Sequence, residues 1–285
     1  MTHRPPAPGV SAPRQAVPAG ACDTHTHVFG GPEFPAGTAP YALPDAALAV
    51  HAAMRDRLGM ARAVLVQPAP YGRDPACLLD ALARGAGRLR GVMIAGETVS
   101  DATLEAWHAA GVRALRFTEM RAPGGTGRYP GTIGTEALIA LAPRLRALGW
   151  QAHLWASAAQ CAALLPRLTP LGLPIVLDHL AMPQGLADPG FDAVLGHLRE
   201  GRVWVKATLC RVPGGGPASL RPLQDRLVAA NPDRVLWGSD WPFVRMDPAP
   251  DAGAMLDLFL GWLGDDGLAR RILVDNPAAL FGFAA

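Results

Sequence analysis

The sequence predicts an α/β fold, and more narrowly a single-domain (β/α)8 barrel. Eight short apolar, β-branched runs recur along the 285 residues, and amphipathic segments separate them. Near-continuous apolar character is typical of parallel strands buried on both faces, and barrels of this length are common. A doubly wound open sheet is the alternative, but no G-x-G-x-x-G follows the first run to support it.

Each element has its own signal. The predicted strands cover residues 21–28, 61–67, 89–96, 112–119, 150–155, 174–179, 203–209 and 234–241. Helical patterns lie between them, for example at 45–59, 101–111, 135–149 and 190–201. Several begin at Ser, Thr, Asp or Pro and end at Gly, as helix capping favours.

The chain begins with a segment unlike the rest. Residues 1–20 contain five prolines and no long apolar run, which predicts an extended, poorly ordered arm and not a secretory signal. The barrel is then expected over 21–285 as one domain, because no linker divides it. No apolar stretch reaches membrane-spanning length.

Composition narrows the partners and the compartment. A formal net charge of +2 with scattered basic residues argues against a nucleic-acid surface. The four cysteines are far apart and form no C-x-x-C pair, which favours reduced thiols. We therefore expect a cytoplasmic enzyme for a small molecule, a monomer or small homo-oligomer, with no membrane or nucleic-acid partner.

The barrel prediction locates the candidate site. Catalytic groups of such barrels lie where the strands end at their C-termini. Polar residues occur there in most of the predicted strands: His25, His27, Gln67, Arg116, Glu119, Arg121, His153, His179, Lys206, Arg211 and Asp240.

Three of these residues suggest specific chemistry. His25 and His27 are two apart, so on a strand they face the same side, as metal chelation or paired donation to a substrate oxygen requires. Asp240 at a strand end can activate water as a general base, although an aspartate there can also cap the next helix. Alternation along strand six sends Asp178 and His179 to opposite faces.

Four motifs resemble a known group. HTHVFG at 25–30, LDH at 177–179, WGSDWP at 237–242 and DNPAALFGF at 275–283 resemble the amidohydrolase superfamily, in particular the branch of 2-pyrone-4,6-dicarboxylate lactonase. The resemblance covers nearly the whole chain after residue 20. It implies a (β/α)8 fold and hydrolysis of a lactone or amide, and it assigns His179 to the mouth of the barrel to polarise a carbonyl.

The resemblance leaves the cofactor open. Many members bind a divalent metal through the strand-one histidines, a strand-five histidine and the strand-eight aspartate, whereas the lactonase works without metal. Here Trp155 stands where the strand-five ligand is expected, and His153 lies one pleat repeat deeper. Metal-free catalysis is therefore favoured, with one zinc on His25, His27 and Asp240, and His153 as a further candidate ligand, as the alternative.

Cationic side chains predict an anionic substrate. Arg116, Arg121 and Arg211 follow strands four and seven, and arginine pairs well with carboxylates. The resemblance adds Tyr41, Lys206 and Trp155 as substrate-contacting positions, although Lys206 could equally pair with a neighbouring carboxylate. Met182 stands where the lactonase pattern has an arginine, which predicts a less cationic pocket.

The resulting hypothesis is a hydrolase that opens a small carboxylated or sugar-acid lactone. Asp240 activates water, and the histidines at 25, 27 and 179 stabilise the oxyanion. A zinc-dependent decarboxylase, a lactone isomerase and a ligand-binding barrel without activity remain as alternatives.

Overall fold

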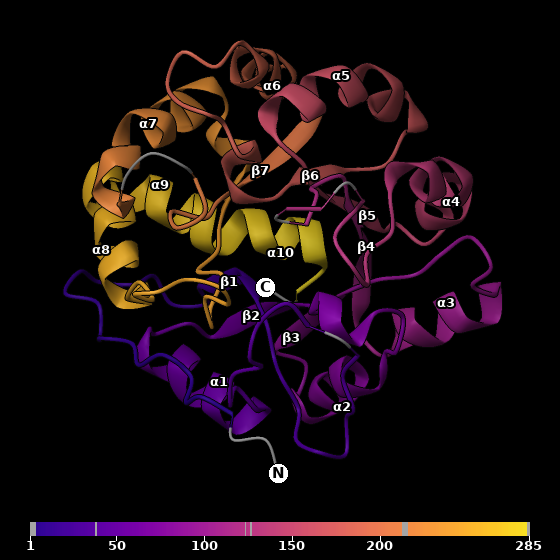
Figure 1. Ribbon diagram of the computed structural model, residues 1–285. Coiled ribbons are helices and arrows are strands. Elements are labelled where there is room, and N and C mark those ends of the chain that lie inside the picture. The colour runs from indigo at the N-terminus through magenta and orange to yellow at the C-terminus, as the bar shows by residue number, and fades with distance from the viewer. Residues whose placement is uncertain (1–3, 38, 123, 126, 213–215, 284–285) are drawn as a thin grey trace.

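A computed structural model describes residues 4–37, 39–122, 124–125, 127–212 and 216–283. Its eight parallel strands form one sheet in the order β1 to β8, with helices surrounding them (Figure 1). The predicted (β/α)8 barrel is confirmed. The first three residues of the predicted arm and the last two of the predicted barrel lie outside the described part.

The strands begin within one residue of the predicted starts, and all except β5 end earlier than predicted. They are β1 (Cys22–Thr26), β2 (Arg62–Val66), β3 (Leu89–Met93), β4 (Val112–Thr118), β5 (Gln151–Trp155), β6 (Ile175–Leu177), β7 (Val203–Ala207) and β8 (Val235–Trp237). The last polar residues of the predicted runs, among them His179 and Asp240, therefore lie in the loops that follow. Those loops, and not the pleat, decide where these side chains point.

Helices follow the strands around the outside. They are α1 (Leu48–Arg57), α2 (Ala76–Arg84), α3 (Asp101–Ala109), α4 (Thr135–Ala147), α5 (Ala158–Leu168), α6 (Pro189–Arg199), α7 (Arg221–Ala230), α8 (Ala252–Leu263), α9 (Asp266–Arg270) and α10 (Asn276–Phe281). None of these described helices combines the length and apolar character needed to cross a bilayer.

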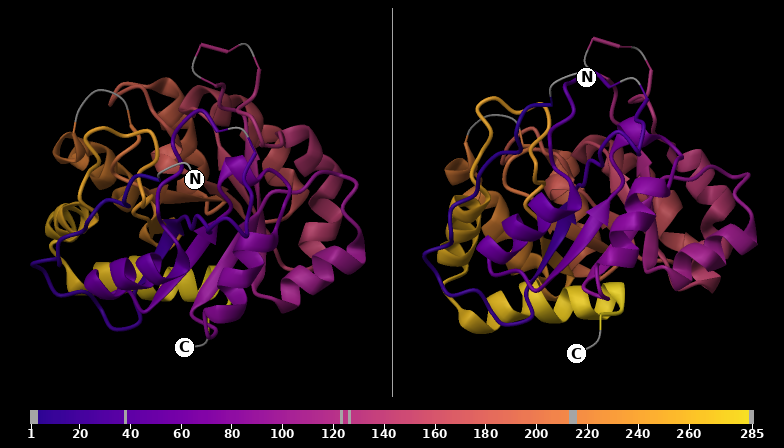
Figure 2. Two further views of the ribbon diagram at one scale, coloured as in Figure 1. Left: turned by 60° about the horizontal axis from the view of Figure 1, so that its bottom comes forward. Right: turned by 90° about the horizontal axis from the view of Figure 1, so that it is seen from below.

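The barrel interior is packed at its lower end. Inward-facing apolar side chains from most of the strands, such as Val64, Val176 and Leu236, form one buried cluster with Phe281 and Phe283. Figure 2 shows α10 lying across this end of the barrel, opposite the loops that follow the strands. The C-terminal segment thus closes the bottom of the barrel interior.

Side chains of β1 join it to β8 and complete the ring. The Thr24 hydroxyl donates to the Trp237 carbonyl at 2.7 Å, and the Asp240 N–H donates to the His25 carbonyl at 2.8 Å. Asp23 Oδ1 accepts from the N–H groups of Ser239 at 3.0 Å and of His25 at 3.1 Å. Closure of the barrel therefore fixes Asp240 beside the histidines of β1.

Residues 4–20 of the arm contact the rest of the chain through their backbone. Asp257 on α8 accepts hydrogen bonds from the backbone of Arg14 at 2.7 Å and of Gln15 at 3.0 Å. The Trp241 indole donates to the Pro8 carbonyl at 3.1 Å. Proline-rich composition predicts an absence of helix, but it does not show that polar groups elsewhere in the chain will bind the extended backbone.

Removal of the Asp257 carboxylate should loosen the arm. We expect Asp257→Ala to lower the free energy of unfolding by about 1–3 kcal/mol, because two backbone donors lose a charged acceptor. Urea unfolding measures this change. The control is Asp225→Ala, whose exposed pair with Arg221 on α7 should change stability by less than about 0.5 kcal/mol. Equal effects in the two variants would show that the arm adds no stability.

Candidate active site

A cavity opens at the C-terminal ends of the strands, where the active sites of such barrels lie. It combines one carboxylate, two histidines and three arginines with aromatic and aliphatic walls. Its lining is His27, Phe29, Tyr41, Pro68, Ala69, Arg116, Tyr129, Trp155, His179, Arg211, Asp240, Val244 and Arg245. Seven of the predicted catalytic and substrate-binding residues line this cavity. Five were indicated by their positions at strand ends, and Tyr41 and Trp155 were added by the resemblance.

His25 in β1 and His27, the residue directly after the end of β1, both point into the barrel. The Val66 carbonyl lies 2.7 Å from His27 Nδ1, and a carbonyl can only accept, so this nitrogen carries a hydrogen. His27 Nε2 then faces Asp240 Oδ1 at 3.3 Å. His25 is fully buried beneath the cavity, with its Nε2 3.5 Å from the same oxygen.

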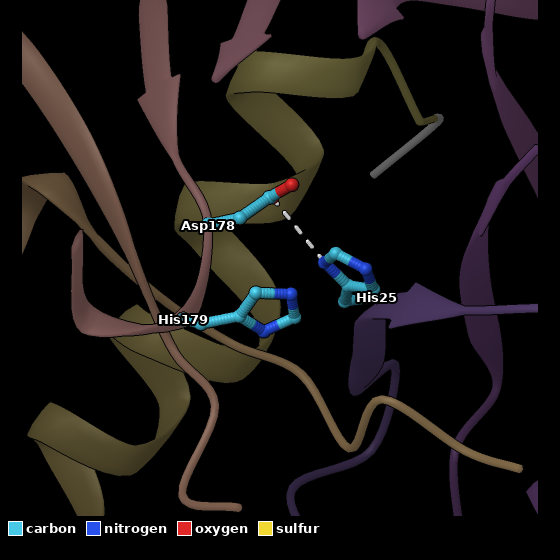
Figure 3. A group of neighbouring side chains, drawn as sticks. All are labelled: His25, Asp178 and His179. Carbon is cyan, nitrogen blue, oxygen red and sulfur yellow. Dashed lines mark ion pairs between the residues drawn. The ribbon is translucent and has the colours of Figure 1, made fainter. Parts of the chain in front are cut away.

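The turn after β6 corrects the expectation that Asp178 and His179 face opposite ways. Four consecutive non-glycine residues, 179–182, have φ between 48° and 60°, a left-handed region that costs such residues about 1–2 kcal/mol each. This turn begins directly after Asp178 and brings both side chains inward, where they point toward His25 (Figure 3). The pleat ends at Leu177, so its alternation does not apply.

Asp178 belongs to a buried ionic cluster below the cavity. Arg116 Nε donates to Asp178 Oδ2 at 2.9 Å, and the Lys206 ammonium lies 3.1 Å from Oδ1. Lys206 also lies 3.2 Å from His25 Nδ1 and 3.0 Å from His153 Nδ1. Because an ammonium can only donate, both ring nitrogens accept, and His25 and His153 carry their hydrogens on Nε2.

This cluster settles two predicted roles. Lys206 has no exposed surface, is not part of the cavity lining and pairs with Asp178, which is the arrangement that the alternative expected. His153 is likewise buried, and its Nδ1 is occupied by Lys206. It lies outside the groups of side chains that are close enough to share a metal ion.

Arg121 is the other predicted residue that the structure separates from the site. It is exposed and lies outside the cavity lining. Its backbone pairs with Arg128 within the loop after β4. Distance in sequence from the strand end explains the difference, because Arg116 lies within β4 and Arg121 lies in the loop beyond it.

Two other polar strand-end residues have structural roles. Gln67 donates to the carbonyls of Gly72 and Asp74, at 2.7 and 2.9 Å, and holds the loop after β2. Glu119 accepts from the backbone and hydroxyl of Thr135 at the start of α4, at 2.7 and 2.6 Å. A polar residue at a strand end is therefore not sufficient to indicate catalysis.

Asp240 is an ionised carboxylate in an enclosed position. Its Oδ2 accepts from Arg211 Nε, and its Oδ1 faces the two histidines of β1. Burial raises the pKa of Asp240, but the Arg211 charge and the three neighbouring histidines together outweigh burial and hold the pKa well below its usual range. The carboxylate is therefore available as a proton acceptor at neutral pH.

Three other titratable groups at the site, His25, His179 and Tyr41, are held neutral. Burial, with Lys206 close by, keeps the pKa of His25 well below its usual value, and burial lowers the pKa of His179 to about 4. Burial also raises the pKa of the Tyr41 phenol, so this hydroxyl keeps its hydrogen. At neutral pH these three side chains can each donate a hydrogen bond without carrying charge.

The charges in and below the cavity sum to a positive value. Four cations, Arg116, Lys206, Arg211 and Arg245, outnumber the two ionised carboxylates, Asp178 and Asp240. Even with Asp23 ionised, one positive charge remains in excess. The cavity therefore favours an anionic ligand, in agreement with the sequence prediction.

Sequence reasoning missed four residues of this region. From the sequence we expected Asp178 to face the outside of the barrel, and we did not consider Asp23, although this residue lies just before the histidine motif. Tyr129 and Arg245 line the cavity from the loops after β4 and β8. The only available signal for Arg245 was its position five residues after Asp240 in the same loop.

Fold and site together define a hydrolase-type barrel with a histidine pair on its first strand and an aspartate after its last. The sequence matches the family described as Amidohydrolase over residues 22–283. The chain therefore belongs to the amidohydrolase family.

Individual relatives cover almost the full chain. A 2-pyrone-4,6-dicarboxylate hydrolase of Comamonas testosteroni is 35% identical over 289 residues, covering 95% of this chain and 93% of the relative. A 4-sulfomuconolactone hydrolase of Rhizobium radiobacter is 33% identical, covering 94% and 91%. The crystal structure of a putative 2-pyrone-4,6-dicarboxylic acid hydrolase from Pseudomonas putida superposes with a TM-score of 0.81 at 30% identity, covering 94% and 100%.

The buried Asp23 gives a pH dependence that stability measurements can detect. Burial raises its pKa from 3.8 to about 6. Between about pH 4 and 6 the folded protein therefore keeps a proton that the unfolded chain releases, so the free energy of unfolding falls as pH rises. The loss is about 3 kcal/mol for a shift of this size.

The asparagine side chain in Asp23→Asn cannot ionise, so the variant should not show this fall in the free energy of unfolding. We expect the stability of the variant relative to wild type to improve by about 2–3 kcal/mol from pH 4 to pH 7, measured by urea unfolding across that range. Asp225→Asn on the surface of α7 is the control and should show no such trend. A constant offset between Asp23→Asn and wild type would mean that Asp23 does not titrate in this window.

Proposed function

We propose that this protein hydrolyses a small lactone that carries an acidic group. One observation supports the proposal above all: Asp240 is held ionised by Arg211, and its free oxygen faces two histidines in a positively charged cavity. The relatives named above act, by their names, on a pyrone dicarboxylate and a sulfonated muconolactone. Both names describe lactones with acidic groups.

Asp240 acts as the general base in this proposal. Water bound beside Oδ1 gives its proton to the carboxylate, and its oxygen attacks the ring carbonyl of the lactone. Arg211 on Oδ2 keeps the carboxylate ionised and leaves Oδ1 as the oxygen that accepts the proton. General-base catalysis of this kind contributes about 10²–10⁴ in rate.

Neutral histidines stabilise the negative oxygen that forms on the carbonyl carbon. His25 carries its hydrogen on Nε2, which has no hydrogen-bond partner among the described residues. The His179 ring lies 4.7 Å from the His25 ring and lines the cavity. Donors that are already in position before the reaction stabilise developing charge at no reorganisation cost.

Collapse of the tetrahedral intermediate breaks the ring C–O bond and requires a proton for the leaving oxygen. His27 is suited to deliver it, because Nδ1–H is bound to Val66 and Nε2 faces Asp240 Oδ1. The proton taken from water can pass from Asp240 to His27 Nε2 and then to the ring oxygen. Water is consumed, and the product is an open-chain hydroxy acid or its keto tautomer.

The histidine and carboxylate donors of the site lie close together, but their hydrogens do not suit a divalent metal. His25 Nε2, His27 Nε2 and Asp240 Oδ1 are close enough to share one ion. A metal ligand needs a lone pair on Nε2, whereas the hydrogen bond from Lys206 places the hydrogen of His25 there. Asp178 Oδ1, at 3.3 Å from His25 Nδ1, is a competing acceptor, but it is already paired with the Lys206 ammonium at 3.1 Å. We therefore propose that the protein works without metal.

The remaining alternatives differ in their products. A lactone isomerase on this site would shuffle a proton with no uptake of water, and a zinc-dependent decarboxylase would release carbon dioxide. A binding barrel without activity would give neither product.

We also propose a cytoplasmic location, which the four unpaired cysteines support. The monomer or small homo-oligomer expected from the sequence stays a prediction.

Asp240→Asn should abolish hydrolysis while leaving binding intact. We expect kcat to fall by at least about 10³, with less than a threefold change in affinity for the lactone, measured by calorimetry. Turnover of wild type in ¹⁸O-labelled water should place one label in the product carboxylate. An unlabelled product would point to isomerisation, and full activity of Asp240→Asn would remove Asp240 from its role.

Metal independence can be checked directly. Protein purified without added metal and dialysed against a chelator should contain much less than one zinc per chain by elemental analysis and should keep its activity. Stoichiometric zinc together with loss of activity on chelation would overturn the metal-free proposal and favour the zinc site on His25, His27 and Asp240.

A further inference from the structure

The three arginines that line the cavity differ in what they already bind. Arg116 is paired with Asp178 at 2.9 Å, and Arg211 is paired with Asp240 and donates to the Val244 carbonyl. Arg245 contacts a neutral group, the Tyr129 hydroxyl, at 3.1 Å, and no carboxylate of the described residues pairs with it. Of the three, Arg245 alone presents a charge that the protein does not itself neutralise.

Tyr129 holds this arginine in place. The guanidinium carbon of Arg245 lies 5.4 Å from the centroid of the Tyr129 ring, in addition to the hydrogen bond to its hydroxyl. Tyr129 is buried and packs against Trp155 with 5.4 Å between ring centroids. Because the Tyr129 oxygen accepts from Arg245, its own hydrogen remains free to be donated to a ligand.

The loop after β8 fixes Arg245 relative to the general base. Asp240, Phe243 and Arg245 all have left-handed backbone, with φ of 65°, 57° and 66°. Phe243 is buried, and its N–H donates to the Asp240 carbonyl at 2.9 Å. Such strain in non-glycine residues persists only where the surroundings impose it, and it concentrates at functional sites.

Resting on the proposed function, we propose that Arg245 and the Tyr129 hydroxyl bind the acidic group of the substrate, a carboxylate or sulfonate remote from the carbonyl that reacts. A guanidinium and a hydroxyl together match the oxygens of such a group. This pair supplies the cation that Met182 does not. Selection for charged over uncharged lactones then depends on Arg245, while Asp240 and the histidines serve both classes.

The test compares 2-pyrone-6-carboxylate with its uncharged methyl ester. For the carboxylate we expect Arg245→Gln to raise KM by about 10- to 100-fold, as for loss of a hydrogen bond between charged groups, with kcat changed less than about threefold. For the ester, both constants should stay within about threefold of wild type. Tyr129→Phe should raise KM for the carboxylate by a smaller factor of about 3- to 10-fold.

Two further variants control for general loss of charge. Arg270→Gln removes a cation from α9, a helix at the bottom of the barrel, and should leave all constants unchanged. Arg121→Gln removes the predicted substrate-binding arginine that lies outside the cavity, and it should not change selection between the carboxylate and the ester. The proposal is overturned if Arg245→Gln affects carboxylate and ester alike, or if Arg121→Gln causes the selective loss.

Binding gives a readout that does not require hydrolysis. In an Asp240→Asn background, adding Arg245→Gln should weaken binding of the pyrone carboxylate by about 10- to 100-fold in calorimetry and leave binding of the ester unchanged. If wild type hydrolyses neither compound, the proposed reaction fails, and these binding constants still decide the role of Arg245. Unchanged carboxylate binding in the double variant would refute it.

Discussion

The buried ammonium of Lys206 organises the floor of the site. It has no exposed surface, and taking an ion out of water costs several kcal/mol. The cost is offset by Asp178 at 3.1 Å and by two ring nitrogens, those of His25 and His153, at 3.2 and 3.0 Å. In return, Lys206 fixes which nitrogen of His25 carries the hydrogen. That choice makes His25 Nε2 a hydrogen-bond donor toward the cavity.

The sequence predicts the scaffold well because its signals are local. Buried parallel strands give continuous apolar runs, and all eight were located to within a few residues at their start. The histidine pair also follows from local geometry, since residues two apart on a strand share a face. The positions of strand ends indicated Arg116, Arg211 and Asp240, and the family resemblance indicated Tyr41 and Trp155; all five line the cavity.

The errors arise where a loop or a long-range contact decides the geometry. Asp178 turns inward because a left-handed turn of four non-glycine residues begins behind it, and no local propensity predicts such a turn. Lys206 and Arg121 are both basic and both near strand ends, yet one is buried in an ion cluster and the other is exposed outside the cavity. Only the three-dimensional partners of each charge separate these outcomes.

Counting cations in the sequence is therefore a poor guide to the charge of the substrate. Arg116 is paired with Asp178 and holds that carboxylate inside the barrel, and Arg211 is paired with Asp240 and keeps it ionised. Removing either arginine would disturb the catalytic groups themselves, so their loss cannot reveal how the ligand is selected. Arg245 donates to the neutral Tyr129 hydroxyl and does not hold a catalytic carboxylate in place. A change at this position can alter which lactones bind without altering how they are opened, which makes the loop after β8 the natural place for specificity to diverge on this barrel.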